Sequence, residues 1–335
     1  KGFAMTKIEA ARQEYTEWCD AIGVNTLEKL NEALDKGYGV KLINICEARQ
    51  ERKYAEAADQ ILWRSGKCPI VMMSGPSSSG KTSSSLRIAQ QCVVVGLNPR
   101  VIELDNYFVD RERTPKDEKG EYDYEALGAM DVDLLSEHIN ALLAGEEVEI
   151  PKFDFVNGRQ ILNSGNRMRL NKGDLLFMEG IHALNPALTP TVDQKKIFHV
   201  YISALSALPY GEKEHGSTTD KRLLRRIVRD NRVRGISPES NILRWPSVRR
   251  GEEINIFPFE ENADIVFNSS TLYDLPLLKY YAEPLLCGIT EASPAYEKAR
   301  SVLEFLDGVR ALKPAEIAAI PPTSIMREFI GGQTL

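Results

Sequence analysis

The sequence has little that would place the chain in a membrane, a disulfide framework or a metal centre. No apolar run in its 335 residues approaches the roughly 18–20 residues that a membrane span needs. The five cysteines are scattered and no pair has C-x-x-C spacing, which disfavours both a disulfide framework and a zinc site. The four histidines show no metal-ligand pairing. We therefore expect a cytoplasmic protein with reduced thiols and no membrane partner.

The charge also excludes some partners. The formal net charge is −6, which argues against general binding to nucleic acid or to an anionic membrane. The window 221–250 is an exception, because it holds ten Lys or Arg residues against two acids. A concentrated basic patch on an acidic protein suits one anionic ligand better than a nucleic acid. Hydrophobic residues make up 43% of the chain, which is ample for a folded core.

Strands and helices alternate along most of the sequence, which predicts an α/β fold with a parallel sheet flanked by helices. The strands that we expect in this sheet are 69–74, 99–104, 174–179, 197–203 and 263–268. The first 66 residues read as mostly helical, apart from a short strand candidate at 40–46. We therefore divide the chain into an N-terminal segment, 1–66, and a larger unit, 67–335.

The most specific motif is Gly75–Thr82, which fits the pattern G-x-x-x-x-G-K-[ST]. It stands between an expected strand and an expected helix at 82–94. Backbone N–H groups of such a loop face phosphate oxygens, and the following helix adds its positive N-terminal end. We expect Lys81 to reach the β- and γ-phosphates of ATP and the Thr82 hydroxyl to bind Mg²⁺. The residues expected to hold ATP here are Gly75, Ser77, Ser78, Ser79, Gly80, Lys81, Thr82 and Ser83.

Two acidic residues stand at the ends of other expected strands, where ligands collect in open α/β sheets. Asp105 follows the strand near 101–104, and a carboxylate there can accept the proton of an attacking hydroxyl. Glu179 ends a buried strand and suits a water-mediated partner of Mg²⁺. The alternative for each residue is a plain turn or cap at a strand end.

An arginine-rich helix is expected at 221–233. Four of its arginines share one face at i, i+3, i+4 and i+7 spacing: Arg222, Arg225, Arg226 and Arg229. Guanidinium groups stabilise the charge on a transferring phosphoryl group. We expect Arg226, Arg229 and Arg234 to close over that group. Together, Lys81, Asp105 and Arg229 form the predicted catalytic set, and a solvated basic face is the alternative for the arginines.

With these residues placed, 69–268 resembles the uridine kinase branch of the phosphoribulokinase/uridine kinase family of P-loop kinases. The matching segments, in order, are Gly75–Thr82, Asp105–Phe108, Tyr122–Glu125, Pro151–Phe155, Phe177–Ile181, Arg225–Asp230 and Ala263–Val266. The resemblance implies a P-loop NTPase fold of the nucleoside monophosphate kinase type, with an arginine-rich lid. It also implies ATP and Mg²⁺ as cofactors and Asp105 as the general base.

The resemblance assigns the acceptor pocket to Tyr107, Tyr124, Glu125, Phe153 and Phe155, besides Asp105. The sequence departs from the family pattern on this side. Glu125 stands where a ribose-binding Asp is usual, and Phe153 stands where a Tyr is usual. Gly158 takes the place of a His that reads the pyrimidine, and Ile236 that of a further Arg. We expect the transfer machinery to be intact and base discrimination to be weaker or redirected.

Two outer segments, 42–61 and 324–332, resemble a bacterial uridine kinase-like group in which the kinase follows a region similar to the N-terminal part of threonyl-tRNA synthetase. This resemblance implies that the protein is truncated at its front. It also implies that 1–66 is a remnant of that region and that 67–335 is a P-loop kinase domain with a C-terminal helix and tail.

The function expected from the sequence is ATP- and Mg²⁺-dependent phosphoryl transfer to a small-molecule hydroxyl, with the 5′-OH of a nucleoside as the first candidate acceptor. A sugar or sugar-phosphate kinase is the alternative within this class. An ATP-binding regulatory module without a dedicated acceptor is the alternative from another class. The sequence leaves open whether the chain forms a homo-oligomer.

Overall fold

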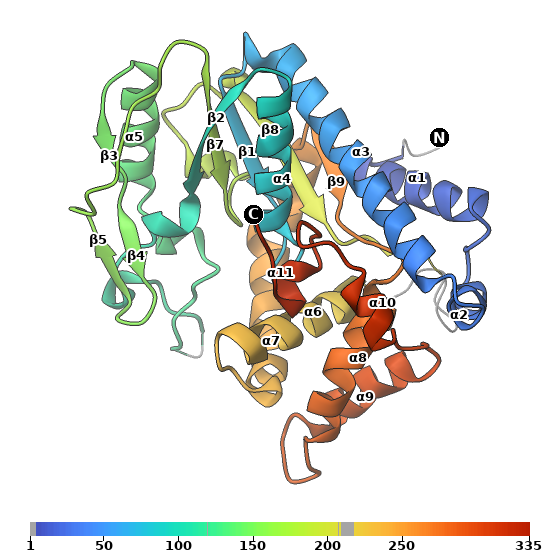
Figure 1. The fold of residues 1–335 in the computed structure, drawn as a ribbon. Coiled ribbons are helices and arrows are strands. Elements are labelled where there is room, and N and C mark those ends of the chain that lie inside the picture. Colours follow the sequence, from blue (N-terminus) through green and yellow to red (C-terminus); the bar gives the residue numbers. More distant parts are fainter. Residues whose placement is uncertain (1–4, 119, 207, 209–217) are drawn as a thin grey trace, which may run out of the picture.

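The centre of the molecule is a five-stranded sheet in which all strands run parallel (Figure 1). The structure is a computed structural model that describes residues 5–118, 120–206, 208 and 218–335. The strands lie in the order β2-β7-β1-β8-β9. Their bounds are β1 Ile70–Ser74, β2 Asn98–Glu103, β7 Asp174–Glu179, β8 Ile197–Ser203 and β9 Ile265–Asn268. The expected parallel α/β sheet is thus confirmed.

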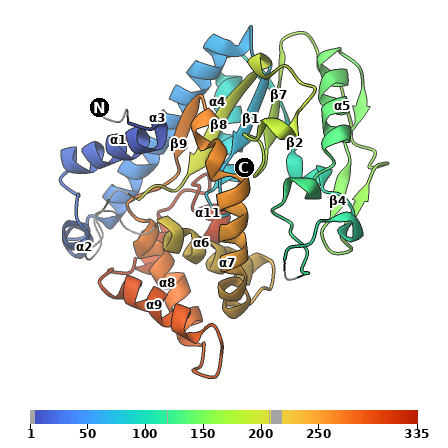
Figure 2. The ribbon, with the colours of Figure 1, turned by 180° about the vertical axis from the view of Figure 1, so that it is seen from behind.

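Helices bury both faces of this sheet, because alternate residues of a strand point to opposite sides. In β1, Val71 and Met73 pack in one core with α3 (Gly39–Ser65) and α4 (Lys81–Val94). Ile70 and Met72 pack in a second core with α5, which spans Val132–Leu143. α3 and α4 lie on the same face of the sheet, as the two opposite views in Figures 1 and 2 show. Because all strands run parallel, the carboxyl ends of β2, β7 and β1 lie at the same edge of the sheet.

The N-terminal segment is helical, as expected, and consists of α1 (Lys7–Ala21), α2 (Leu27–Asp35) and α3. The expected strand at 40–46 is wrong, because these residues form the first turns of α3. Leu42, Ile43 and Cys46 are buried there at i, i+1 and i+4, which is one face of a helix. A short apolar run of this kind fits a strand and a buried helix equally well.

A small antiparallel excursion leaves the main sheet after α5. It contains two ribbons, one pairing β3 (Val148–Glu149) with β6 (Arg167–Met168). The other pairs β4 (Lys152–Asp154) with β5 (Arg159–Ile161). The sequence predicted a hairpin-like excursion over this region, and the structure divides it into two short pieces. The tip between β4 and β5 reaches the main cavity described below.

The remaining helices pack with the N-terminal segment in one large core. They are α6 Thr218–Val233, α7 Pro238–Asn255, α8 Asp274–Cys287, α9 Tyr296–Asp307, α10 Pro314–Ala318 and α11 Arg327–Ile330. The sequence did not predict α7 and α8, which contain Pro246 and Pro284 in their interiors. Within the described ranges, none of the helices has the length and apolar character to cross a lipid bilayer.

Candidate phosphoryl-transfer site

Three neighbouring strands, β2, β7 and β1, deliver the predicted site residues to one edge of the sheet. The loop Gly75–Thr82 follows β1, and Glu179 is the last residue of β7. Asp105 lies in a short 3-10 helix, Leu104–Tyr107, directly after β2. In the sheet register, Glu179 lies beside both Met73 and Glu103. Parallel pairing therefore brings together residues that are about a hundred positions apart in the chain.

The loop after β1 has the backbone shape that phosphate binding requires. Gly80 lies at φ 84° and Ser78 at φ 57°, so the chain makes two left-handed steps before α4 begins at Lys81. Successive left- and right-handed residues turn backbone N–H groups inward to form an anion-binding concavity. The Lys81 ammonium donates to the carbonyl oxygen of Pro76 at 3.3 Å, which folds its side chain back over this concavity.

This edge of the sheet opens into a cavity of about 780 Å³. The predicted site residues that line it are Ser77, Ser78, Gly80, Lys81, Thr82, Asp105, Glu125, Phe155, Glu179, Arg226, Arg229 and Arg234. Donor-side and acceptor-side candidates thus share one space. The volume is in the range of sites that enclose a small-molecule ligand.

Three acceptor-pocket candidates are not among the lining residues of this cavity. Tyr107 is buried in the core, where its hydroxyl lies 3.0 Å from Nδ1 of His138, because the 3-10 helix turns this side chain toward α5. Tyr124 is exposed beside Tyr122. Phe153 lies behind Phe155, with ring centroids 5.0 Å apart. We therefore withdraw Tyr107 as an acceptor contact and treat Phe153 as support for Phe155.

Five arginines that lie in α6 or directly after it divide into two groups. Arg226, Arg229 and Arg234 reach the cavity around the carboxylate of Asp230, at N–O distances of 3.5, 2.8 and 3.6 Å. Arg226 also donates to the Ser77 hydroxyl at 2.9 Å. Asp230 is fully buried, so it fixes three guanidinium groups at one wall.

The second group is buried and donates hydrogen bonds to the backbone of the phosphate-binding loop. Arg222 donates to the Ser77 carbonyl at 2.9 Å, and Arg225 donates to the Ser79 carbonyl at 3.3 Å. Arg225 also forms an ion pair with Asp274 at 2.6 Å. Arg222 and Arg225 belong to the shared helix face that the spacing predicts. Their side chains point to the loop rather than to solvent.

Three glutamates in the cavity were not predicted from the sequence: Glu103, Glu252 and Glu328. Two of them contact the loop after β1. Glu252 of α7 accepts from the Ser77 N–H at 2.9 Å and pairs with Arg222 and Arg249. Glu328 of α11 accepts from the Ser83 hydroxyl at 2.6 Å. These contacts join residues 175 and 245 positions apart, so no local motif marks them.

Two carboxyl groups in the cavity, those of Glu179 and Asp105, have pKa values above their usual range. Removal from water raises the pKa of Glu179 to about 7, and the nearby charge of Asp105 adds to this rise while Lys81 opposes it. The pKa of Asp105 is also raised by partial removal of its carboxylate from water at the cavity wall, and Lys81 and Arg234 oppose that shift. A base with a raised pKa takes up a proton more readily.

The donor set is compatible with Mg²⁺. The Thr82 hydroxyl lies 3.3 Å from a carboxylate oxygen of Glu179, and both face the cavity. Within the described part of the chain, no group of three or more His, Cys, Asp or Glu could hold a metal ion alone. Mg²⁺ prefers oxygen ligands and normally retains waters and substrate phosphates in such sites. A hydroxyl and one carboxylate therefore suit an ion that arrives with a nucleotide.

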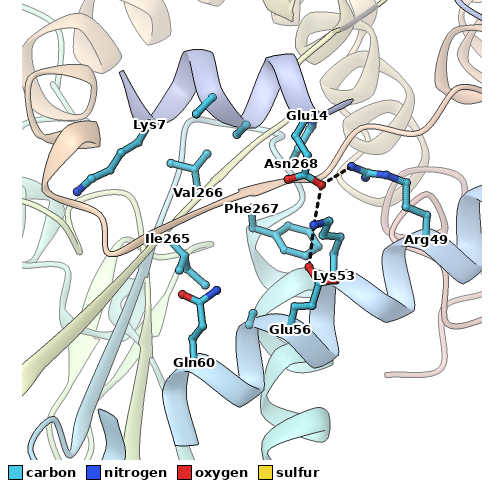
Figure 3. Close-up of a pocket in the computed structure, with 13 residues that line it drawn as sticks. Lys7, Glu14, Arg49, Lys53, Glu56, Gln60, Ile265, Val266, Phe267 and Asn268 are labelled. Carbon is cyan, nitrogen blue, oxygen red and sulfur yellow. Dashed lines mark hydrogen bonds and ion pairs between the residues drawn. The ribbon is translucent and has the colours of Figure 1, made fainter. Parts of the chain in front are cut away.

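A second, smaller cavity of about 300 Å³ lies between α1, α3 and β9 (Figure 3). Most of its charged groups neutralise one another, since Glu14 pairs with Arg49 at 3.2 Å and with Lys53 at 2.6 Å, while the Lys7 ammonium donates to the backbone carbonyls of Glu261 and Ala263. Lys53 pairs in addition with Glu56 at 2.7 Å. These paired charges give no reason to place a charged ligand there, and the main cavity remains the candidate site.

Comparisons with known proteins show the family of the chain. Residues 70–275 match the phosphoribulokinase / uridine kinase family. A uridine kinase of Halobacterium salinarum is 30% identical over 195 residues, which are 58% of this chain and 77% of that protein. A uridine kinase of Staphylococcus haemolyticus is 30% identical over 199 residues, or 59% of this chain and 86% of that one.

Among solved structures, one of a protein provisionally assigned as a fructose transport system kinase from Silicibacter sp. TM1040 aligns with a TM-score of 0.45 and 18% identity. It covers 64% of this chain and 98% of the other. The family match spans more than half of the chain. The chain therefore belongs to the phosphoribulokinase / uridine kinase family, which confirms the resemblance seen in the sequence and supports a nucleotide-binding kinase.

Proposed function

We propose that this protein transfers the γ-phosphoryl group of ATP, with Mg²⁺, to a hydroxyl of a small molecule, and that the acceptor is the 5′-OH of a nucleoside. The observation that carries the proposal is the shared cavity. Lys81, Arg226, Arg229 and Arg234 line one part of it. Asp105 lines the same space from the end of β2, two strands away from β1 in the sheet. A phosphate-binding loop alone indicates nucleotide binding, whereas an added carboxylate supplies a base for an acceptor.

On the donor side, the loop amides and Lys81 bind the β- and γ-phosphates. Arg226, Arg229 and Arg234 stabilise the negative charge on the phosphoryl group during transfer. Thr82 and Glu179 are the residues that would hold Mg²⁺, which neutralises phosphate charge when bound. Arg222, Arg225 and Glu252 hold the backbone of the loop in place. The phosphate-binding groups therefore need little rearrangement to act.

On the acceptor side, Asp105 accepts the proton of the attacking hydroxyl. The hydroxyl oxygen forms a bond to the γ-phosphorus, and the bond from that phosphorus to the β,γ-bridging oxygen breaks, which leaves ADP. The proton ends on the Asp105 carboxylate. Positioning and charge stabilisation supply most of the rate in reactions of this type.

Glu125 and Phe155 are the proposed acceptor contacts. Glu125 is half-buried on the cavity wall, and burial raises the pKa of its carboxyl while Arg226 opposes the shift. A carboxylate there can accept hydrogen bonds from ribose hydroxyls, and the Phe155 ring can pack against a base. Both relatives named above are uridine kinases, which supports a nucleoside.

A sugar or sugar phosphate is the second candidate acceptor, and one observation favours it. At Gly158, a Cβ atom would lie 2.6 Å from Nε of Arg111, so that guanidinium occupies the space into which a side chain at 158 would project. The family's pyrimidine-reading side chain therefore has no equivalent at 158. A smaller acceptor without a base does not need that contact.

The test is acceptor-dependent ADP release across a panel of nucleosides, sugars and sugar phosphates, with mass spectrometry of the products. Lys81→Ala is the control, because it removes the phosphate-binding ammonium and should abolish any release that comes from this site. A new nucleoside monophosphate supports the nucleoside proposal, and a new sugar phosphate supports the second candidate. ADP release at one slow rate with every compound would contradict both and favour the regulatory module.

A further inference from the structure

The C-terminal segment 324–333 covers the start of α4, beside the phosphate-binding loop. Figure 1 shows α11 directly below the N-terminal end of α4. The Ser83 hydroxyl donates to the Glu328 carboxylate at 2.6 Å and accepts from the side-chain amide of Gln333 at 2.7 Å. The backbone N–H of Ser83 also donates to Glu328, at 3.4 Å. Two side chains of the segment therefore converge on one residue of the proposed ATP site.

The contacted N–H is one that a phosphate would use. The first N–H groups of a helix have no partner within the helix. In α4 the N–H of Ser84 donates to Gly80, whereas that of Ser83, one residue earlier, is taken by Glu328. Such N–H groups, followed by a helix, bind the phosphates of nucleotides in loops of this kind. The Glu328 carboxylate is therefore an internal anion at an anion-binding position.

The backbone of the segment is firmly attached, so only side chains need to move. Ile325 and Phe329 are buried, and the Arg225 guanidinium lies over the Phe329 ring at 5.0 Å. Ile325 also packs so closely on Gly80 that a Cβ atom there would lie 2.5 Å from its Cδ1. The side chain of Glu328, in contrast, lines the main cavity with Lys81 and Thr82.

The charge of Glu328 opposes a bound nucleotide. Among the described residues no ion pair neutralises it, although the charge of Arg234 attracts it, and it contributes to the raised pKa of Glu179 across the cavity. A phosphate group and a carboxylate cannot share the same hydrogen-bond donors without strong repulsion.

We propose that Glu328 is an affinity-determining residue of the nucleotide site: its carboxylate occupies the Ser83 donors in the free protein and must leave them when the phosphates bind. The inference rests on the proposed function, because it takes ATP to be the ligand of the loop. It adds that the C-terminal segment weakens that binding through one side chain. Gln333 holds the Ser83 hydroxyl in the orientation that Glu328 uses.

The experiment compares the dissociation constants of ADP and ATP for the wild-type chain and for Glu328→Gln, each with and without Mg²⁺. The amide removes the charge but preserves the shape, so the fold should be retained, and thermal unfolding checks this. We expect about tenfold tighter binding of both nucleotides, with and without the metal ion, from the loss of one charge-assisted contact and its repulsion. Glu304→Gln, at an exposed position of α9, makes the same change of net charge and should leave both constants unchanged.

The outcomes separate this inference from the proposed function. Equal affinities for wild type and variant, or no binding by either, overturn the inference. Weaker binding by Glu328→Gln only when Mg²⁺ is present also overturns it, because Glu328 would then assist the metal. Nucleotide binding that tightens in the variant, without turnover of any acceptor, supports the inference and contradicts the proposed kinase reaction. Glu328→Asp keeps the charge but shortens the side chain, and a smaller gain in affinity is expected for it.

Discussion

The donor and acceptor sides of the cavity are built in different ways. On the donor side, Arg222, Arg225 and Glu252 are at most 2% exposed and hold the loop through its backbone. On the acceptor side, Phe155 is 62% exposed and Val156 is 86% exposed at the tip of a two-stranded ribbon. The proposed phosphate site is thus held by buried side chains, whereas the ribbon tip of the proposed acceptor site is exposed. Acceptor choice can change there without disturbing the transfer machinery.

The largest effect should come from the cavity-facing arginine that links the two sides. Replacing Arg226 by Gln removes a guanidinium from the transferring phosphoryl group and should lower kcat by about 10³-fold. Nucleotide affinity should fall much less, since Lys81 and the loop amides remain. Steady-state kinetics with a nucleotide-binding assay separate the two. Arg232→Gln, on the same helix but exposed, is the matched control, and equal losses in both variants would remove Arg226 from the mechanism.

The buried donor-side contacts should matter for stability as well as for activity. Among the described residues, Arg225→Met leaves the Asp274 carboxylate with Lys221, 3.7 Å away, and the Thr271 hydroxyl as its side-chain partners. Leaving a buried charge without its main partner costs about 3 kcal/mol in the free energy of unfolding. Chemical denaturation measures this loss. Adding Asp274→Leu to the variant should recover part of it, and a single variant as stable as wild type would show that the ion pair contributes little.

The smallest effect is expected on the exposed acceptor side. Phe155→Ala should raise the KM for the acceptor by about tenfold or less, the loss expected for one aromatic contact, and leave kcat nearly unchanged. The free energy of unfolding should change by about 0.5 kcal/mol or less, as is usual for exposed positions. Leu162→Ala, in the same excursion but outside the cavity lining, should change neither quantity. A large loss of stability in Phe155→Ala would contradict the contrast between a buried donor side and an exposed acceptor side.

The sequence predicted the parts of this molecule that local patterns determine. The phosphate-binding loop is contiguous, so its motif, its strand and its helix could be identified together. The arginines of α6 were found from helical spacing, but spacing could not show that Arg222 and Arg225 are buried under the loop. The strand expected at 40–46 failed because a buried helix face and a buried strand give the same short apolar run.

The contacts that the sequence missed depend on the tertiary fold. Glu252 and Glu328 reach the site from helices far along the chain. Glu328 lies in the segment 324–332 that carries a resemblance, but the resemblance gave that residue no role. Tyr107 was misplaced for a related reason. It follows Asp105 by two residues, yet the 3-10 helix turns its side chain into the core against His138. Proximity in sequence to a site residue does not by itself bring a side chain to the site.

In the proposed mechanism, one cavity holds both the phosphate-binding residues and a separate base for the acceptor. The measurement that tests it most directly is the rate of phosphoryl transfer by Asp105→Asn at saturating ATP and acceptor, paired with its dissociation constant for ATP. The asparagine keeps the shape of the side chain but cannot take the proton, so we predict a loss of about 10³-fold in rate with ATP affinity nearly unchanged. Retained turnover would contradict the role of Asp105 as the base and, with it, the proposed division of the cavity.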